Sequence, residues 1–172
     1  PNLMFWNRFG EAFSDVSAAG GFAHLQKGHA IAFADIDDDG DQDVFQEMGG
    51  AFPGDGAADC LYLNPGFKNS WIKIKLIGTR SNRSAIGARI KVDTTELENR
   101  RSIYKWVNCG GSFGENPLRQ EIGLGAAVGI ERIEIYWPTT DETQEFHNVA
   151  VNQTIEIVEG ATEFSVTSKL NQ

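Results

Sequence analysis

The chain has 172 residues, enough for one large domain or two small ones, and its composition is that of a globular protein. Its net charge of -9 argues against nucleic acid or anionic lipid as a partner, because binding to phosphates needs a basic surface. No apolar run approaches the roughly eighteen residues of a membrane-spanning helix, so membrane insertion is not expected. The excess acid lies in residues 1–69, which hold eleven acids against three bases, and this predicts a cation as partner.

Short apolar runs rich in β-branched and aromatic residues recur along the chain between Gly, Asn, Asp and Pro, a pattern that predicts an all-β protein. In the first part, the predicted strands are Leu3–Trp6, Ala30–Ile36, Val44–Glu47 and Cys60–Leu63. The turn signal Asn64-Pro65-Gly66, followed by Lys68-Asn69, predicts a boundary between one unit at residues 1–69 and a second at residues 70–172.

The second unit alternates more clearly. In the predicted strand Trp71–Ile77, the apolar residues share one face, whereas Lys73 and Lys75 lie on the other. The further predicted strands are Ile86–Val92, Ile103–Val107, Glu131–Trp137, Thr143–His147, Thr154–Val158 and Phe164–Thr167. The charged run Glu96–Arg101 predicts a hairpin tip. Short strands at this spacing predict a β-sandwich or jelly-roll-like domain.

Residues 35–43 form an Asp-rich loop that reads Asp-Ile-Asp-Asp-Asp-Gly-Asp-Gln-Asp, with six Asp in nine residues. The spacing DxDxDGxxD supplies the hard oxygen ligands that Ca²⁺ takes, and Gly40 permits the sharp turn. The predicted ligands are Asp35, Asp37, Asp39, Asp41 and Asp43. The first three would bind through carboxylates and the fourth through its carbonyl, and the last would close the shell. Mg²⁺ suits the loop less, because it demands a tighter octahedron.

The nearest alternative to this interpretation is an EF-hand. Its bidentate Glu belongs at loop position 12, where this chain has Gln46, and its loop lies between two helices that the sequence does not predict. The Asp loop is therefore expected to join two strands, with the side chain of Asp38 pointing to solvent.

The first unit also carries a family pattern. The matching stretches are Phe5-Trp6-Asn7, Phe13-Ser14-Asp15-Val16-Ser17, the run from Ala32 to Asp43, and Leu61-Tyr62-Leu63-Asn64. Together they resemble an FG-GAP (VCBS-type) repeat, which implies a β-propeller blade that binds calcium between two strands. A single repeat rarely buries its own apolar face. Either the chain is the C-terminal part of a longer propeller protein, or the lone blade packs on the second unit, as we favour; Cys60 and Trp71 would then lie near the interface.

The second unit carries a second family pattern, and its matching stretches follow one another in the order found in that family. The matching stretches are Ala85–Ile90, Gly110-Gly111-Ser112-Phe113 with Asn116 and Pro117, Ile122–Gly125, Ile133–Pro138 and Val149–Gln153. They resemble the ASPIC/UnbV domain, which follows FG-GAP repeats in the family of cartilage acidic protein and its bacterial relatives. The resemblance implies a secreted, periplasmic or cell-surface protein without an established catalytic activity.

The predicted fold is therefore all-β, with one propeller-blade-like calcium-binding β unit packed on a β-sandwich or jelly-roll-like domain. The leading hypothesis for the function is a non-catalytic, extracytoplasmic module that binds a protein or a surface, with a structural calcium ion. The alternative is a calcium-dependent, lectin-like carbohydrate-binding domain, and a hydrolase is the least favoured.

Candidate residues for a ligand surface are Tyr104, Trp106 and Trp137, although aromatic residues in strands more often pack in a core. The two cysteines, Cys60 and Cys109, fall one in each unit and lack the CxxC spacing of a metal or redox site. The sequence does not decide between a disulfide that joins the two units and two free thiols.

Overall fold

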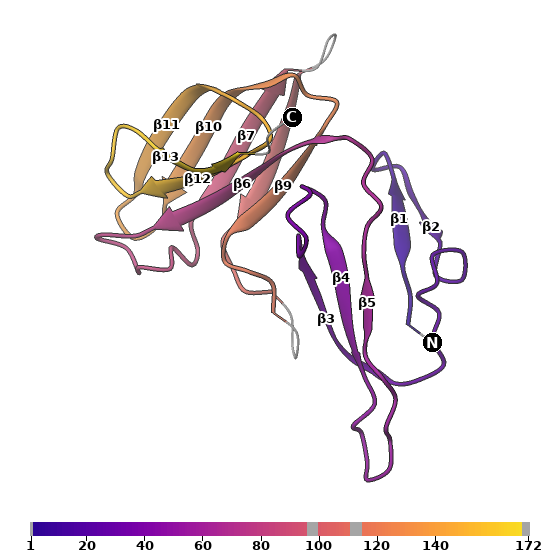
Figure 1. The fold of residues 1–172 in the computed structure, drawn as a ribbon. Coiled ribbons are helices and arrows are strands. Elements are labelled where there is room, and N and C mark those ends of the chain that lie inside the picture. Colours follow the sequence, from indigo (N-terminus) through magenta and orange to yellow (C-terminus); the bar gives the residue numbers. More distant parts are fainter. Residues whose placement is uncertain (1, 96–99, 111–114, 170–172) are drawn as a thin grey trace.

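The computed structural model describes residues 2–95, 100–110 and 115–169, and these form thirteen β-strands in four sheets without a helix among them (Figure 1). The predicted all-β class is thus confirmed. Part of the predicted tip, residues 96–99, lies outside the described residues, while Arg100 and Arg101 begin a strand. Within the described part of the chain, no helix is long and apolar enough to cross a membrane.

The first unit contains two small antiparallel sheets, drawn in indigo and purple in Figure 1. A hairpin pairs β1 (Phe5–Arg8) with β2 (Ala12–Asp15). The other sheet has the order β3 (Gly28–Ala34), β4 (Asp43–Met48) and β5 (Cys60–Tyr62). The Asp loop joins β3 to β4, so it lies between two strands as predicted. The sequence did not predict β2, because Ala12–Asp15 lacks the apolar run that marks the neighbouring strand β1.

The second unit is a sandwich of two four-stranded sheets. The first is antiparallel and has the order β11 (Glu142–Val149), β10 (Gly129–Trp137), β7 (Arg89–Thr95) and β8 (Arg100–Trp106). The second has the order β13 (Ser165–Lys169), β12 (Gln153–Val158), β6 (Ser70–Ile77) and β9 (Gln120–Gly125). In this sheet β12 runs parallel to β6, and the other neighbours are antiparallel. The sequence did not predict β9, because Gly123 and Gly125 interrupt its pattern.

The hydrophobic core lies between the two sheets of the sandwich. Alternate residues of β6, β7, β10 and β12 form one buried cluster, with Ile74, Ile133 and Ile155 completely inaccessible to solvent. The alternation predicted for the strand at Trp71–Ile77 is therefore confirmed on its apolar side. On the other side Lys75 is exposed as expected, but Lys73 is buried. This difference arises because the Asp loop of the first unit covers that part of β6.

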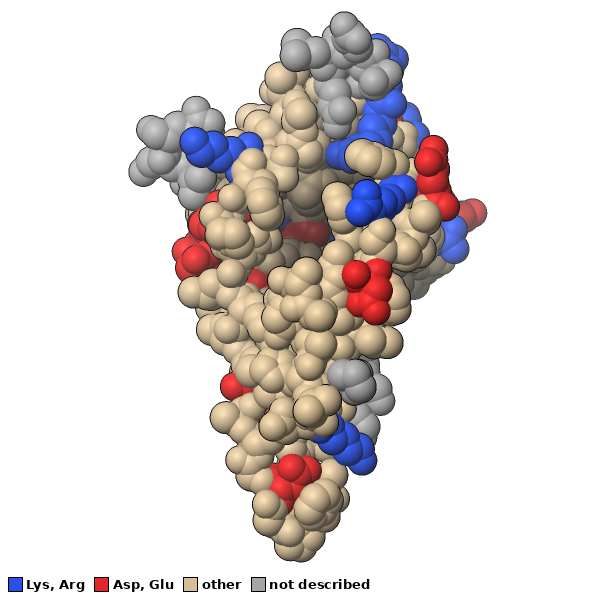
Figure 2. All heavy atoms as spheres, turned by 90° about the vertical axis from the view of Figure 1, so that its right-hand side faces the viewer, with Lys and Arg blue, Asp and Glu red and all other residues tan. Residues whose placement is uncertain are grey.

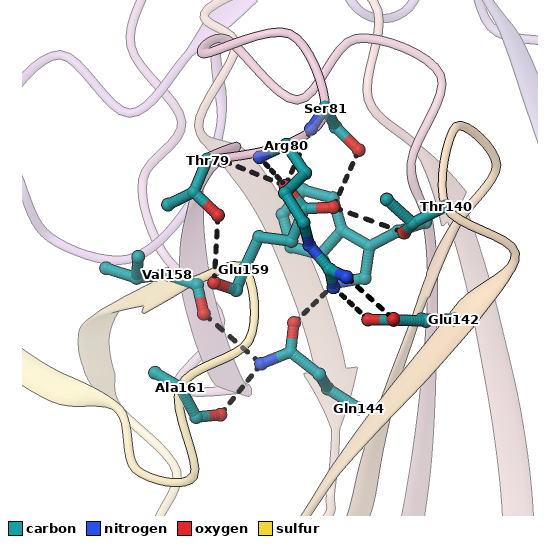
Figure 3. Close-up of polar contacts among 10 residues, drawn as sticks. Thr79, Arg80, Ser81, Thr140, Glu142, Gln144, Val158, Glu159 and Ala161 are labelled. Carbon is teal, nitrogen blue, oxygen red and sulfur yellow. Dashed lines mark hydrogen bonds and ion pairs between the residues drawn. The ribbon is translucent and has the colours of Figure 1, made fainter.

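A buried carboxylate anchors the loop that follows β6. The side chain of Glu159 accepts hydrogen bonds from the backbone N–H groups of Thr79, Arg80 and Ser81, and from the hydroxyls of Ser81 and Thr140 (Figure 3). Burial alone would raise the pKa of this carboxyl, but the hydrogen bonds from Ser81, Thr79 and Arg80 outweigh it and lower the pKa from 4.5 to about 2. The group is thus held as an anion that ties β12 to the start of the loop.

We expect acid to weaken this anchor. Because the folded-state pKa of Glu159 lies below the ordinary value of 4.5, its stabilising effect is complete above that pH and is lost as the pH falls toward about 2. The difference in pKa corresponds to about 3 kcal/mol, which sets the upper limit of the expected effect. Urea unfolding of Glu159→Gln should show lower stability at neutral pH and a flatter pH dependence than Glu163→Gln, an exposed control. Equal profiles for the two variants would contradict the anchor.

Candidate metal centre

Three carboxylates of the Asp loop converge. Asp35, Asp37 and Asp39 each offer one oxygen, and these oxygens lie within 4.8 Å of one another. Asp37 and Asp39 are exposed, whereas Asp35 is only 6% exposed. The Oδ1 atom of Asp35 is buried and has no hydrogen-bond partner among the described residues. A buried carboxylate oxygen without a partner is costly, and a bound cation would remove that cost.

Hydrogen bonds within the loop set its shape. The N–H of Gly40 donates to Asp35 Oδ2 at 2.8 Å, the N–H of Asp39 donates to Asp37 Oδ1 at 3.3 Å, and the N–H of Asp41 donates to Asp39 Oδ1 at 2.9 Å. Gly40 has a φ of 101°, in the region that favours glycine. Each bond uses one oxygen of its carboxylate, so a second oxygen of each converging residue is left for a cation.

The other two predicted ligands use their side chains to hold neighbouring backbone. Asp43 is buried, and its two oxygens accept the N–H groups of Ile36 at 2.9 Å and Asn64 at 2.8 Å. Asp41 Oδ2 accepts the N–H of Phe67 at 3.1 Å. The structure thus brings together three of the five predicted ligands. Metal binding through the carbonyl of Asp41 stays a prediction, and the role of Asp43 as a backbone tie was not foreseen.

A lysine of the second unit reaches the loop. Lys73 Nζ of β6 lies 2.6 Å from Asp35 Oδ2 and 2.8 Å from Asp38 Oδ1. The side chains of Lys73 and Asp35 are 3% and 1% exposed, so this ion pair is shielded from water. Burial lowers the pKa of Lys73, but its hydrogen bonds with Asp35 and Asp38 outweigh burial and raise the pKa above the ordinary value. Asp38 is exposed to solvent as predicted, yet one of its oxygens binds the ammonium group.

Two further residues of the sandwich hold the loop. The indole of Trp71 packs so closely on Gly40 that a Cβ at residue 40 would overlap the ring. Glu121 of β9 is buried, and its Oε2 accepts the N–H of Asp35 at 3.0 Å and the amide of Gln42 at 3.1 Å. Trp71 therefore lies at the interface between the units, as expected.

Much of the apolar surface of the first unit is exposed. Its exposed large apolar residues are Leu3, Phe5, Trp6, Phe9, Phe13, Leu25, Ile31, Ile36, Phe45, Phe52, Leu61, Leu63 and Phe67. Figure 2 shows only a few charged side chains on the lower part of one face, which belongs to this unit. Among the described residues, the members of the buried core cluster run from Ile72 to Ile157 and all belong to the second unit. Among the described residues, the contact between the units is thus made mainly by the Asp loop, and an apolar sheet face of the kind expected for a packed blade does not form it.

The predicted aromatic ligand surface is only partly assembled. Tyr104 and Trp106 lie on β8, at the edge of its sheet, and are 58% and 52% exposed. Trp137 is fully buried in the core of the sandwich and does not share their surface. The two cysteines, Cys60 and Cys109, are free thiols, and Cys60 Sγ lies 3.7 Å from His24 Nε2.

These features define a β-sandwich module with an acidic loop held against one of its sheets. A family model described as ASPIC and UnbV matches residues 78–164, which is half of the chain, from the end of β6 to the segment before β13. The chain therefore belongs to the ASPIC/UnbV family. No curated protein sequence matches the chain. The family match does not reach the first unit, so the resemblance of residues 1–69 to an FG-GAP repeat stays a prediction.

Proposed function

We propose that the chain is a non-catalytic, calcium-binding extracytoplasmic module that binds a protein or a surface, and that its ion is structural. The observation that supports this proposal most directly is the buried Oδ1 of Asp35, which lacks a partner in a loop where three carboxylates converge. The ASPIC/UnbV domain is typically extracellular, and extracellular modules bind calcium with modest affinity because the ion is abundant there.

The donor set favours a hard cation. Asp35, Asp37 and Asp39 offer oxygen only, and calcium accepts six to eight oxygens, some of which come from carbonyls and water. Lys73 and Gly40 bind Oδ2 of Asp35 and leave Oδ1 to the ion, so the ammonium group and the cation can act together. On this proposal, residues 1–69 form an FG-GAP-type repeat whose calcium loop is the part that meets the sandwich.

The position of the loop supports a structural role for the ion. The loop joins β3 to β4 and contacts β6 and β9 of the sandwich through Lys73 and Glu121. An ion bound to Asp35, Asp37 and Asp39 would hold the loop in the shape in which these contacts form. Calcium would thus stabilise both the first unit and its contact with the second.

Removal of calcium should lower the melting temperature. Binding to the folded state alone stabilises it by about 2.7 kcal/mol when free calcium is about 100 times the dissociation constant. We expect a chelator to abolish this gain, calcium to restore it, and magnesium to restore little. Asp37→Asn should remove the response in calorimetric melts, whereas Glu47→Gln, an exposed control on β4, should keep it. Identical melts with chelator and with calcium, and no heat in a calcium titration, would refute the proposal.

A further inference from the structure

A groove of about 480 Å³ lies on the outer face of the sheet that contains β7, β8 and β10. Because Ile90 and Val92 of β7 point into the core, Arg89 and Lys91 point outward to this face. The groove is lined mainly by Arg89, Lys91, Tyr104, Lys105, Trp106, Glu134 and Tyr136.

Strand register places aromatic and cationic side chains next to one another. Trp106 of β8 pairs with Arg89 of β7, and Arg89 pairs in turn with Tyr136 of β10. The guanidinium carbon of Arg89 lies 5.4 Å from the centre of the Tyr136 ring, a cation–π contact. One step along the strands, Tyr104 pairs with Lys91. Arg89 is therefore held between two aromatic residues, with its N–H groups available to a ligand.

The groove is positive in a protein whose net charge is -9. On the outer face its lining has two cations, Arg89 and Lys91, against one carboxylate, Glu134. Lys105 pairs with the core residue Ile90, so its side chain lies on the opposite side of β8. Lys91 pairs with Asp93 at 3.3 Å, but within the described ranges no carboxylate forms an ion pair with Arg89. A guanidinium that lacks a carboxylate partner is suited to bind one from a ligand through two parallel hydrogen bonds.

The next hollow on the same face differs in this respect. It is lined by Arg132 and Asp93 among others, and Arg132 pairs with Asp93 at 2.9 Å and with Glu145 at 3.1 Å. Its charge is thus largely neutralised within the protein. In the described part of this groove, Arg89 keeps a guanidinium without a carboxylate partner, and a single such group fits a ligand with spaced carboxylates better than a densely charged polyanion such as nucleic acid.

The two exposed rings add a second element of recognition. Tyr104 and Trp106 are two residues apart on β8, so they lie about 7 Å apart along the strand. Exposed aromatic rings in a groove bury apolar area at low entropic cost when a ligand covers them. The C–H face of a pyranose ring is flat and apolar, and successive sugar units can each cover one ring.

The groove also continues past the edge of the sheet. A second hollow, of about 250 Å³, shares Tyr104, Lys105 and Trp106 with it and extends to Asn116 and Arg119. Two adjoining hollows that share these three residues fit an extended chain better than a single sugar.

We propose that this groove binds an acidic polysaccharide built of uronic acid units, with Arg89 pairing with a sugar carboxylate while Tyr104 and Trp106 stack on sugar rings. The site is distinct from the Asp loop and does not require calcium. An acidic peptide would satisfy Arg89 but offers no repeated flat face for the two aromatic rings.

The test is a calorimetric titration of the whole chain with hexagalacturonate, maltohexaose and hexaglutamate, all in chelator so that calcium cannot bridge. We expect hexagalacturonate to bind at least about tenfold more tightly than the other two. Trp106→Ala and Arg89→Gln should each weaken its binding about tenfold or more, as substitutions at the centre of a site do. Both residues are on the surface, so melting curves should show that the variants stay folded.

The chain offers a matched control pair. Trp6 is 52% exposed, as Trp106 is, and the guanidinium carbon of Arg8 lies 4.5 Å from its ring centre, but this pair lies on β1. Trp6→Ala and Arg8→Gln should leave the affinity unchanged. Equal binding of maltohexaose would overturn the role of charge, and equal binding of hexaglutamate would overturn the role of the sugar rings. No binding of hexagalacturonate, or an equal loss in the control variants, would overturn the site itself.

Discussion

Lys73→Met is expected to weaken the contact between the Asp loop and the sandwich by about 3 kcal/mol when calcium is absent, because one partner of a buried ion pair is lost. Lys73 and Asp35 are both shielded from water, so the carboxylate of Asp35 would be left buried without its cation. The loop can escape this cost by moving away from β6. The effect should therefore show first as local opening, and not as unfolding of the sandwich, whose core lies elsewhere.

Hydrogen exchange can measure this opening directly. The N–H of Asp35 donates to Glu121 Oε2 at 3.0 Å and the N–H of Phe33 donates to Asn116 Oδ1 at 2.8 Å, and both bonds cross between the units. In Lys73→Met these two amides should exchange about a hundredfold faster, since every 1.4 kcal/mol is a factor of ten. Lys75→Met is the matched control, because Lys75 is an exposed residue of the same strand and its ion pair with Glu156 contributes little.

Calcium should change the size of this effect. If the ion binds Asp35, Asp37 and Asp39, it would supply the positive charge that Lys73→Met removes. The variant should then gain more protection at the Asp35 amide from calcium than the original protein does. An equal response to calcium in both proteins would mean that the ion and the ammonium group do not share Asp35.

The same lysine shows what the sequence can and cannot predict. Alternation along Trp71–Ile77 correctly placed Lys73 and Lys75 on the side away from the core. It could not show that Lys73 is buried, because the covering group is the Asp loop, which is distant in the sequence. The loop was itself predicted, since its spacing is a local property. Its contact with β6 depends on how the two units pack together, and a local sequence pattern carries no information about that packing.

The candidate sites also divide into features that follow from local spacing and features that depend on long-range packing. The convergence of Asp35, Asp37 and Asp39 follows from spacing within one loop. The use of both Asp43 oxygens by backbone N–H groups does not, because one of these groups belongs to Asn64, beyond the next strand. Among the aromatic residues, residue type alone did not separate Trp106, at an exposed sheet edge, from Trp137, in the core. The face of each strand separates them, because Trp137 follows Ile133 and Ile135 on the buried face of β10, whereas Trp106 pairs with Arg89 on the outer face.

Gly40→Ala is expected to destabilise the docked loop by about 3 kcal/mol, through two separate causes. The φ of 101° at Gly40 is strained for any residue with a Cβ, which costs about 1 kcal/mol or more. The added methyl group would also overlap the buried indole of Trp71, and overpacking of this kind costs about 1–3 kcal/mol. Urea unfolding, together with exchange of the Asp35 amide, should report the loss.

A control glycine separates the two causes. Gly54 has a φ of 91°, and a Cβ there would have no atom within 4 Å, so Gly54→Ala carries the backbone strain without the overlap. Its cost should be clearly smaller than that of Gly40→Ala. Trp71→Leu should remove most of the overlap, so that Gly40→Ala made in that background costs about as much as Gly54→Ala. If the cost at residue 40 does not change when Trp71 is replaced, the glycine serves the turn alone. If the cost falls, Gly40 is also needed for the contact with Trp71. The close approach of the loop to the sandwich is then encoded in the sequence of the loop itself.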